Sequence, residues 1–127
     1  MSANNKEIVE KVNASFAEGG SGGEGFLSFC ADEVAWTMVG HKTVKGKTAI
    51  REWLAAMDIE PPKFTVDNVI AEGDFATAYG DMTMKDKNGK WEPYAYCDIY
   101  RFRDGKIAEL SSFVIKTAAK AETASGA

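Results

Sequence analysis

The spacing of hydrophobic residues changes once along the chain, close to residue 64. Before that point, apolar residues recur every three or four positions over 4–18, 26–30 and 49–57, which predicts three helices. A short apolar run at 34–39 (VAWTMV) interrupts them and is a strand candidate. Beyond residue 64, hydrophobic and polar positions alternate, as in strands whose side chains point to opposite faces. The first half is therefore predicted to be mainly helical and the second half a sheet.

Turn dipeptides divide the second half into hairpins. Gly73-Asp74, Asn88-Gly89 and Asp104-Gly105 each combine glycine with Asp or Asn, a composition that favours tight turns. They separate four alternating segments, which are 64–73, 74–86, 91–103 and 106–116. Helices that come first and strands that follow predict an α+β class, with the helices packed on one face of a curved, antiparallel (mixed) sheet.

The strand predicted over 91–103 carries one carboxylate, Asp98, in the middle of one face. The other residues on that face are aromatic: Tyr94, Tyr96, Tyr100 and Phe102. An unpaired buried charge is costly, so a carboxylate in such a place either finds partners or stays protonated. We predict a raised pKa and a catalytic role for Asp98 as an acid. The alternative is a structural aspartate with a lowered pKa, paired to a basic group or to backbone amides.

Small residues on the neighbouring strand leave room over the sheet. Ala76, Ala78 and Gly80 share one face with Met82 and Met84, and flexible thioethers suit an apolar ligand. The alternative is that these small residues lie beneath a packed helix. The predicted ligand-binding residues are Trp36, Met38, Trp53, Met82, Tyr96, Ser112 and Val114.

His41 is the one histidine of the sequence and follows the first predicted strand. Its unperturbed pKa suits acid–base work near neutrality, which makes it the second catalytic candidate. A solvated turn residue is the alternative. The nearby Gly-Lys-Thr at 46–48 does not form a phosphate-binding loop, because five residues rather than four separate Gly40 from Gly46.

The composition of the chain limits the classes of molecule that we expect it to bind. The 127 residues form one predicted domain over 1–117, with a disordered tail at 118–127. A net charge of -4 gives no basic footprint for nucleic acid, and no apolar run suggests a signal peptide or a membrane span. We read Cys30 and Cys97 as reduced core residues of a cytoplasmic protein. No metal site and no cofactor are predicted, because few ligand residues converge.

The order of sequence blocks resembles a known family. ADEVAWTMVG, GKTAIREWLAAM, VDNVIAEGDFATAYGD and YCDIYRFRDGKIAEL are similar to the SnoaL-like and ketosteroid isomerase-like branch of the nuclear transport factor two-like superfamily. This resemblance implies a cone-shaped sheet with about three N-terminal helices on its concave face, a conical pocket and a homodimer. The scaffold hosts isomerases, cyclases, epoxide hydrolases, dehydratases and binding modules without catalysis.

The chemistry of these relatives transfers only in part. Asp98 matches the protonated acid of the ketosteroid isomerases, but Thr37-Met38 replaces the proton-shuttling carboxylate and Ser15-Phe16 lies where the first-helix tyrosine is expected. Steroid isomerisation is therefore not predicted. Epoxide hydrolases need two carboxylates bridged by arginine, and Arg101 is predicted to face away from Asp98. Polyketide cyclases use an aspartate or histidine over an apolar cavity, and Asp98 with His41 is the nearest arrangement here.

Two classes of function stay open from the sequence. One is an enzyme that performs proton transfer of isomerase, cyclase or hydratase type on a small hydrophobic, carbonyl-bearing molecule. The other is a non-catalytic ligand-binding or dimerisation module of the same fold. A homodimer is predicted through the outer sheet face, where Phe113, Ile115 and Tyr79 point away from the pocket.

Overall fold

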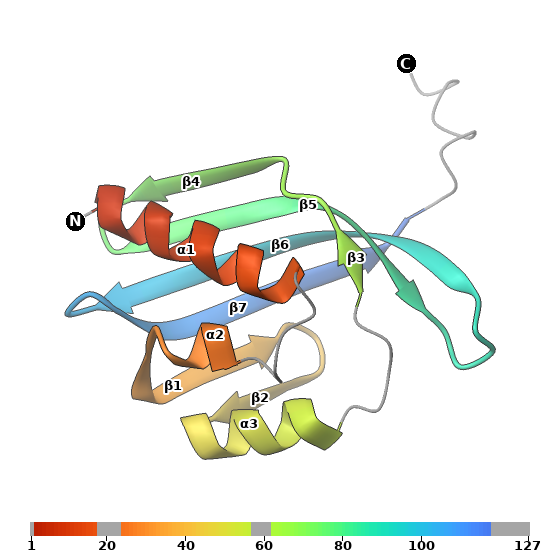
Figure 1. The fold of residues 1–127 in the computed structure, drawn as a ribbon, viewed down its shortest axis with the longest axis horizontal. Coiled ribbons are helices and arrows are strands. Elements are labelled where there is room, and N and C mark those ends of the chain that lie inside the picture. Colours follow the sequence, from red (N-terminus) through yellow and green to blue (C-terminus); the bar gives the residue numbers. More distant parts are fainter. Residues whose placement is uncertain (1, 18–23, 57–61, 118–127) are drawn as a thin grey trace.

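The computed structural model describes residues 2–17, 24–56 and 62–117. Within these segments the chain forms helices at one end and strands through the rest (Figure 1). The elements are α1 (Ser2–Ala17), α2 (Glu24–Leu27), β1 (Cys30–Met38), β2 (Lys42–Lys45), α3 (Lys47–Ala56), β3 (Lys63–Phe64), β4 (Asn68–Glu72), β5 (Phe75–Lys85), β6 (Trp91–Arg103) and β7 (Lys106–Lys116).

All the strands belong to one curved, unclosed sheet. Their order is β2-β1-β7-β6-β5, with β3 and β4 both paired to the far side of β5. β1 pairs with β7 in parallel, whereas the other described pairs are antiparallel. The predicted α+β class with a mixed, curved sheet is confirmed.

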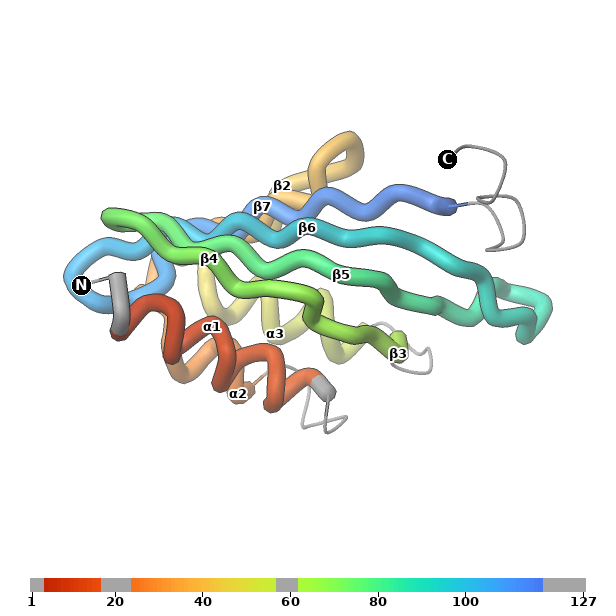
Figure 2. Tube along the Cα trace, turned by 90° about the horizontal axis from the view of Figure 1, so that it is seen from above, coloured from red at the N-terminus to blue at the C-terminus, as the bar shows by residue number. Residues whose placement is uncertain are grey.

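The helices lie on one face of this sheet, which we call the inner face (Figure 2). α1 packs over β4 and β5, whereas α3 packs over β1 and β2 and α2 lies between the two longer helices. Val9 and Val12 of α1, Phe26 of α2 and Ile50 of α3 are fully buried against the sheet. The buried amide of Asn5 donates to the carbonyl oxygen of Gly73 (3.2 Å), which ties α1 to the β4–β5 turn. None of the described helices lies on the outer face.

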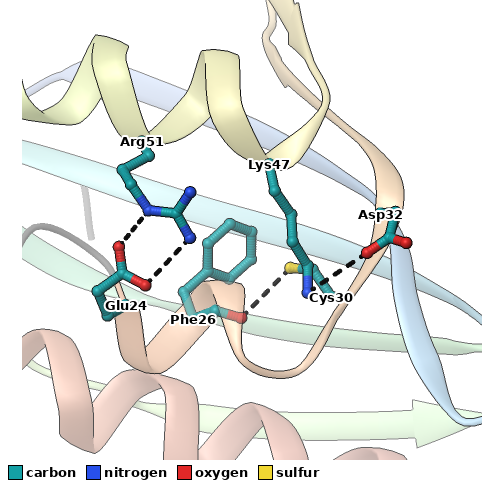
Figure 3. A network of polar contacts seen from close by, with 6 residues as sticks. All are labelled: Glu24, Phe26, Cys30, Asp32, Lys47 and Arg51. Atoms are coloured by element: carbon teal, nitrogen blue, oxygen red, sulfur yellow. Dashed lines mark hydrogen bonds and ion pairs between the residues drawn. The ribbon is translucent and has the colours of Figure 1, made fainter.

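Polar contacts join α2 to α3 at the edge of the inner face (Figure 3). The Arg51 guanidinium forms two hydrogen bonds to the carboxylate of Glu24, and Lys47 lies 3.8 Å from Asp32. The Cys30 thiol donates to the carbonyl oxygen of Phe26 at 3.3 Å. Burial raises the pKa of Cys30 to about 12, so this thiol is inert and structural.

The segment predicted as one strand over 64–73 is broken into β3 and β4. Between them, the carbonyl oxygen of Thr65 accepts a hydrogen bond from the Tyr96 hydroxyl at 2.7 Å. A Cβ added to Gly80 would lie 2.2 Å from the same carbonyl oxygen. Glycine at position 80 thus lets the connection fold down onto β5, and this close approach interrupts the strand.

Helix starts also differ from the sequence prediction. Ile50 N–H donates to the carbonyl oxygen of Gly46, so α3 begins at Lys47, before the predicted start at residue 49. Gly46 has φ +93°, a conformation that glycine adopts without strain. The first helix likewise begins earlier than predicted, at Ser2 instead of residue 4. The second helix stops at Leu27, and Cys30 instead opens β1.

Some predictions fall on segments that lie outside the described residues. These are residue 18 at the end of the first predicted helix, Met57 at the end of the third predicted helix and the tail at 118–127. The domain limits therefore stay predictions. None of the helices in the described segments has the length and apolar character needed to cross a membrane.

Candidate functional site

Asp98 lies near the centre of the inner sheet face. Alternation along β6 puts its side chain on the same side as Tyr96 and Tyr100, which are both buried. Strand register places Ser112 of β7 on one side of Asp98 and Ala78 of β5 on the other. The full row across the sheet is Lys42, Met38, Ser112, Asp98, Ala78 and Val69.

Asp98 is surrounded by aromatic and small residues, and the residue as a whole is half-buried. Burial raises its pKa from 3.8 to about 6, and a hydrogen bond from Ser112 opposes this shift. Desolvation outweighs the hydrogen bond because the charged form loses more hydration than one hydroxyl replaces. Asp98 therefore gains or loses its proton close to neutral pH, within the range that acid–base catalysis uses.

Ser112 links Asp98 to a tryptophan on β1. The indole Nε1–H of Trp36 donates to Ser112 Oγ at 2.9 Å, and the serine itself is 5% exposed. The Val39 N–H donates to the carbonyl oxygen of Ser112 at 3.0 Å, which fixes the serine backbone against the end of β1. Two predicted ligand-binding residues, Trp36 and Ser112, are thus engaged with each other and with the predicted acid.

Trp36 is also the centre of an aromatic cluster that joins the helices to the sheet. Its ring lies 5.2 Å from that of Phe26 and 5.2 Å from that of Trp53, the latter at 88°. The Phe16 ring of α1 lies 6.5 Å away. One indole is therefore held by a residue from each helix, an arrangement that leaves it little freedom to rotate.

Lys42 was missed by sequence reasoning and belongs to the same face. Its ammonium lies 5.5 Å from the centre of the Trp53 ring, a cation–π contact at the end of the Asp98 row. Three strand spacings, about 14 Å, separate its Cα from that of Asp98. Lys42 lies two residues before the half-buried Val44, after the β1–β2 turn, so the two side chains share one face of β2. This spacing is the sequence signal that could have located Lys42.

The remaining predicted ligand residues are spread over the inner face. Met38, Trp53, Met82 and Val114 are half-buried, so each keeps some accessible surface. Tyr96 is buried, and its hydroxyl already donates to the carbonyl oxygen of Thr65. Burial, together with nearby carboxylates, raises the pKa of Tyr96 to about 12, which keeps the hydroxyl protonated.

His41 lies in the turn after β1 and is exposed. Met38 lies on β1, two strands away from Asp98 on β6. His41 follows three residues after Met38, in a turn where the His41 N–H donates to the carbonyl oxygen of Met38 at 2.8 Å. The structure therefore does not bring the two catalytic candidates into contact. The catalytic role of His41 stays a prediction, as does that of Asp98.

The surface also has two hollows away from Asp98. A groove of about 500 Å³ runs between α1 and the β3–β4 segment, and a second hollow of about 590 Å³ lies at the start of α3. Asn13 of α1 lines the groove at 7% exposure, and its Nδ2 meets no acceptor among the described residues. Nowhere in the described segments do three or more His, Cys, Asp or Glu side chains gather as metal ligands would.

The outer face has a different character. Phe113, Ile115 and Tyr79 are exposed there, with Ile115 at 66%, and none of the described helices covers them. Both cysteines are unpaired thiols, but Cys97 lies half-buried on this face between Phe113 and Tyr79. The interpretation of Cys97 as a core residue was therefore wrong, because the elements that the structure describes form no second layer over its side of β6.

Solved structures define the class to which this fold belongs. An NTF2-like protein from Cytophaga hutchinsonii superposes with a TM-score of 0.71 and 26% identity, covering 87% of this chain and 98% of that one. A candidate SnoaL-like polyketide cyclase from Jannaschia sp. CCS1 gives 0.78 and 15% identity, over 89% and 86%. TerC, co-crystallized with polyporic acid, gives 0.74 and 21% identity, over 86% and 89%. The chain has the cone-shaped NTF2-like fold.

The sequence profile of the SnoaL-like domain matches residues 9–110. The chain belongs to the SnoaL-like family, as its sequence blocks indicated. No curated protein sequence matches it significantly.

Proposed function

We propose that this SnoaL-like protein binds a small hydrophobic, carbonyl-bearing molecule on its inner sheet face and transfers protons with Asp98 as the acid. The reaction would be of isomerase, cyclase or hydratase type. One observation carries the proposal: Asp98 is a half-buried residue among aromatic side chains on the inner face, and burial raises the pKa of its carboxyl to about 6. The co-crystal of TerC with polyporic acid supports a small-molecule ligand on this fold.

The chemistry follows from a neutral carboxyl next to a carbonyl group. Protonated Asp98 donates to the carbonyl oxygen of the ligand, which makes the hydrogens on the adjacent carbon more acidic. A base, either water or His41, takes one of these hydrogens as a proton while the oxygen receives the proton of Asp98, and an enol results. In a ligand with a carbon–carbon double bond next to that carbon, return of a proton to a different carbon, while the enol oxygen gives its proton back to Asp98, completes an isomerisation. The apolar surfaces of Met38, Met82 and Val114 hold the ligand and exclude water.

The second candidate is a binding or dimerisation module without catalysis. It is favoured by the separation of His41 from Asp98, which leaves no side-chain base in contact with the acid. In both cases we propose a homodimer that buries the apolar outer face around Phe113 and Ile115.

Deuterium exchange of a simple ketone tests the proposal. We would incubate 2-tetralone with the protein in D2O at pH 5 and follow loss of its α-hydrogen signals by NMR. The wild type is expected to accelerate exchange, Asp98→Asn to lose most of the acceleration, and His41→Ala to show whether histidine or water is the base. Because the protonated acid is required, the acceleration should decline as the pH rises through about 6.

The two candidates give different results. If 2-tetralone quenches tryptophan fluorescence in a saturable way but its exchange equals the uncatalysed rate, the protein is a binding module. If exchange is accelerated equally by wild type and Asp98→Asn, another group performs the chemistry and the proposed role of Asp98 is wrong.

A further inference from the structure

The hydrogen bonds around Ser112 have a fixed direction. An indole nitrogen can only donate, so Ser112 Oγ must accept from Trp36 Nε1 at 2.9 Å. A serine hydroxyl has a single proton of its own to donate. Strand register pairs Ser112 with Asp98, and an ionised carboxylate can only accept, so the hydrogen bond between them uses the Ser112 proton and lowers the pKa of Asp98. The donors therefore run from Trp36 to Ser112 to Asp98.

This direction determines which oxygen of Asp98 can carry a proton. The oxygen that faces Ser112 accepts a hydrogen bond whether the carboxyl is neutral or charged. A proton that binds to Asp98 must then occupy the other oxygen, which does not face β7. Without Trp36, the Ser112 hydroxyl could turn and accept from a protonated Asp98, so the proton could move to the oxygen that faces Ser112.

We propose that Trp36 is a positioning residue: its indole N–H fixes the Ser112 hydroxyl as a donor, so that the proton of Asp98 is held on the carboxyl oxygen that does not face Ser112. The effect of Trp36 on catalysis rests on the function proposed above, whereas the order of hydrogen bonds from Trp36 to Ser112 to Asp98 does not depend on that function. The aromatic cluster supports this role, because the rings of Phe26 and Trp53 lie 5.2 Å from the indole and restrict its rotation.

Few other polar or charged groups on the sheet lie close enough to Asp98 to affect its protonation. Tyr96 and Tyr100 flank it on β6, and burial raises the pKa of both, so both stay protonated and neutral. The nearest side chain of β5 in the row is Ala78, and Lys42 of β2 lies at the far end beyond Met38 and Ser112. Ser112, and through it Trp36, is the polar contact that the sheet supplies to this carboxyl.

NMR provides a readout that a purely structural tryptophan would not move. We would titrate the protein from pH 4 to 8 and follow the Asp98 carboxyl carbon together with the indole N–H of Trp36. In the wild type the indole signal should shift with the same midpoint as Asp98, because the charge is transmitted through Ser112. In Ser112→Ala this coupling should vanish and the Asp98 midpoint should rise, because the carboxylate has lost its donor.

The variants Trp36→Phe and Trp53→Phe form a matched pair within one aromatic cluster. Trp36→Phe frees the Ser112 hydroxyl to accept from neutral Asp98, so the Asp98 midpoint should rise by several tenths of a pH unit. Trp53→Phe removes an indole from the same cluster without touching Ser112 and should leave the midpoint unchanged, as should Ser112→Thr, which keeps the hydroxyl.

Two results would overturn the inference. One is an Asp98 midpoint that is the same in Trp36→Phe as in the wild type. The other, which needs no tryptophan variant, is a Trp36 indole signal in the wild type that does not shift as Asp98 titrates. The ketone exchange assay separates this failure from failure of the proposed function. Coupled titration without exchange supports the positioning role alone, and exchange that depends on Asp98 without coupling supports the function alone.

Discussion

Replacing Asp98 with asparagine should stabilise the protein at neutral pH and change its stability little at pH 4. The folded protein holds a proton on Asp98 up to a pKa of about 6, whereas the unfolded chain releases it near 3.8. The stabilisation from this group is therefore fully present below the unfolded pKa and is lost as the pH rises through the folded one. Asparagine has a similar shape and keeps a donor and an acceptor, but it never becomes charged.

The size of the effect follows from the pKa difference. A shift from 3.8 to about 6 is roughly two pH units, and each unit corresponds to 1.36 kcal/mol. The difference in unfolding free energy between Asp98→Asn and the wild type should therefore grow from near zero at pH 4 to about 3 kcal/mol at pH 7. That is a large share of the roughly 5–15 kcal/mol by which domains are stable.

Urea unfolding at half-unit steps from pH 4 to 7.5, followed by tryptophan fluorescence, measures this difference. Comparing the two proteins at each pH cancels the titration of groups that they share. Asp81→Asn, at an exposed aspartate of β5, controls for the loss of one negative charge from the sheet. A difference that stays flat across the range, or that favours the wild type increasingly as the pH rises, would refute the argument that burial dominates at Asp98.

Three further predictions concern the surfaces around this site. Light scattering should give a dimer at micromolar concentration that Phe113→Asp converts to a monomer; a wild-type monomer would exclude the outer-face interface. An apolar fluorescent probe should quench tryptophan emission, and enlarging Met82 or Ala78 to Trp should abolish binding; binding that survives both changes would place the ligand elsewhere. Asn13→Leu should raise the unfolding free energy by about 1–3 kcal/mol, because it removes a buried donor without an acceptor; destabilisation in urea would show that the amide is satisfied.

The fold could be read from the sequence because its signals are local. Strand alternation and hairpin dipeptides place Asp98 among the aromatic residues of β6, and the structure keeps that face inward. Asp104 has φ +54° and Gly105 φ +78°, as a tight Asp-Gly turn requires. Such information is contained in a few neighbouring residues, so no tertiary contact is needed to find it.

What could not be predicted depends on residues far apart in the chain. Trp36 and Ser112 are 76 positions apart and meet only because β1 pairs with β7 in parallel, a register that no turn specifies. The break between β3 and β4 arises from Thr65 approaching Gly80, which alternation alone does not reveal. Cys97 was placed on the correct strand face but read as core, because the sequence does not say that this face lacks a covering layer.

The cost of keeping Asp98 bears on whether this protein is an enzyme. A module that only dimerises through its outer face would gain stability from a neutral residue at position 98, since Ser112 could donate equally well to an amide oxygen. The chain instead retains a carboxyl that weakens the folded state by about 3 kcal/mol at neutral pH. It also directs the Ser112 proton toward that carboxyl through an indole held by residues of α2 and α3. Groups that lower stability while their surroundings are well ordered are typical of functional sites. The balance therefore favours proton-transfer chemistry at Asp98 over a purely structural role.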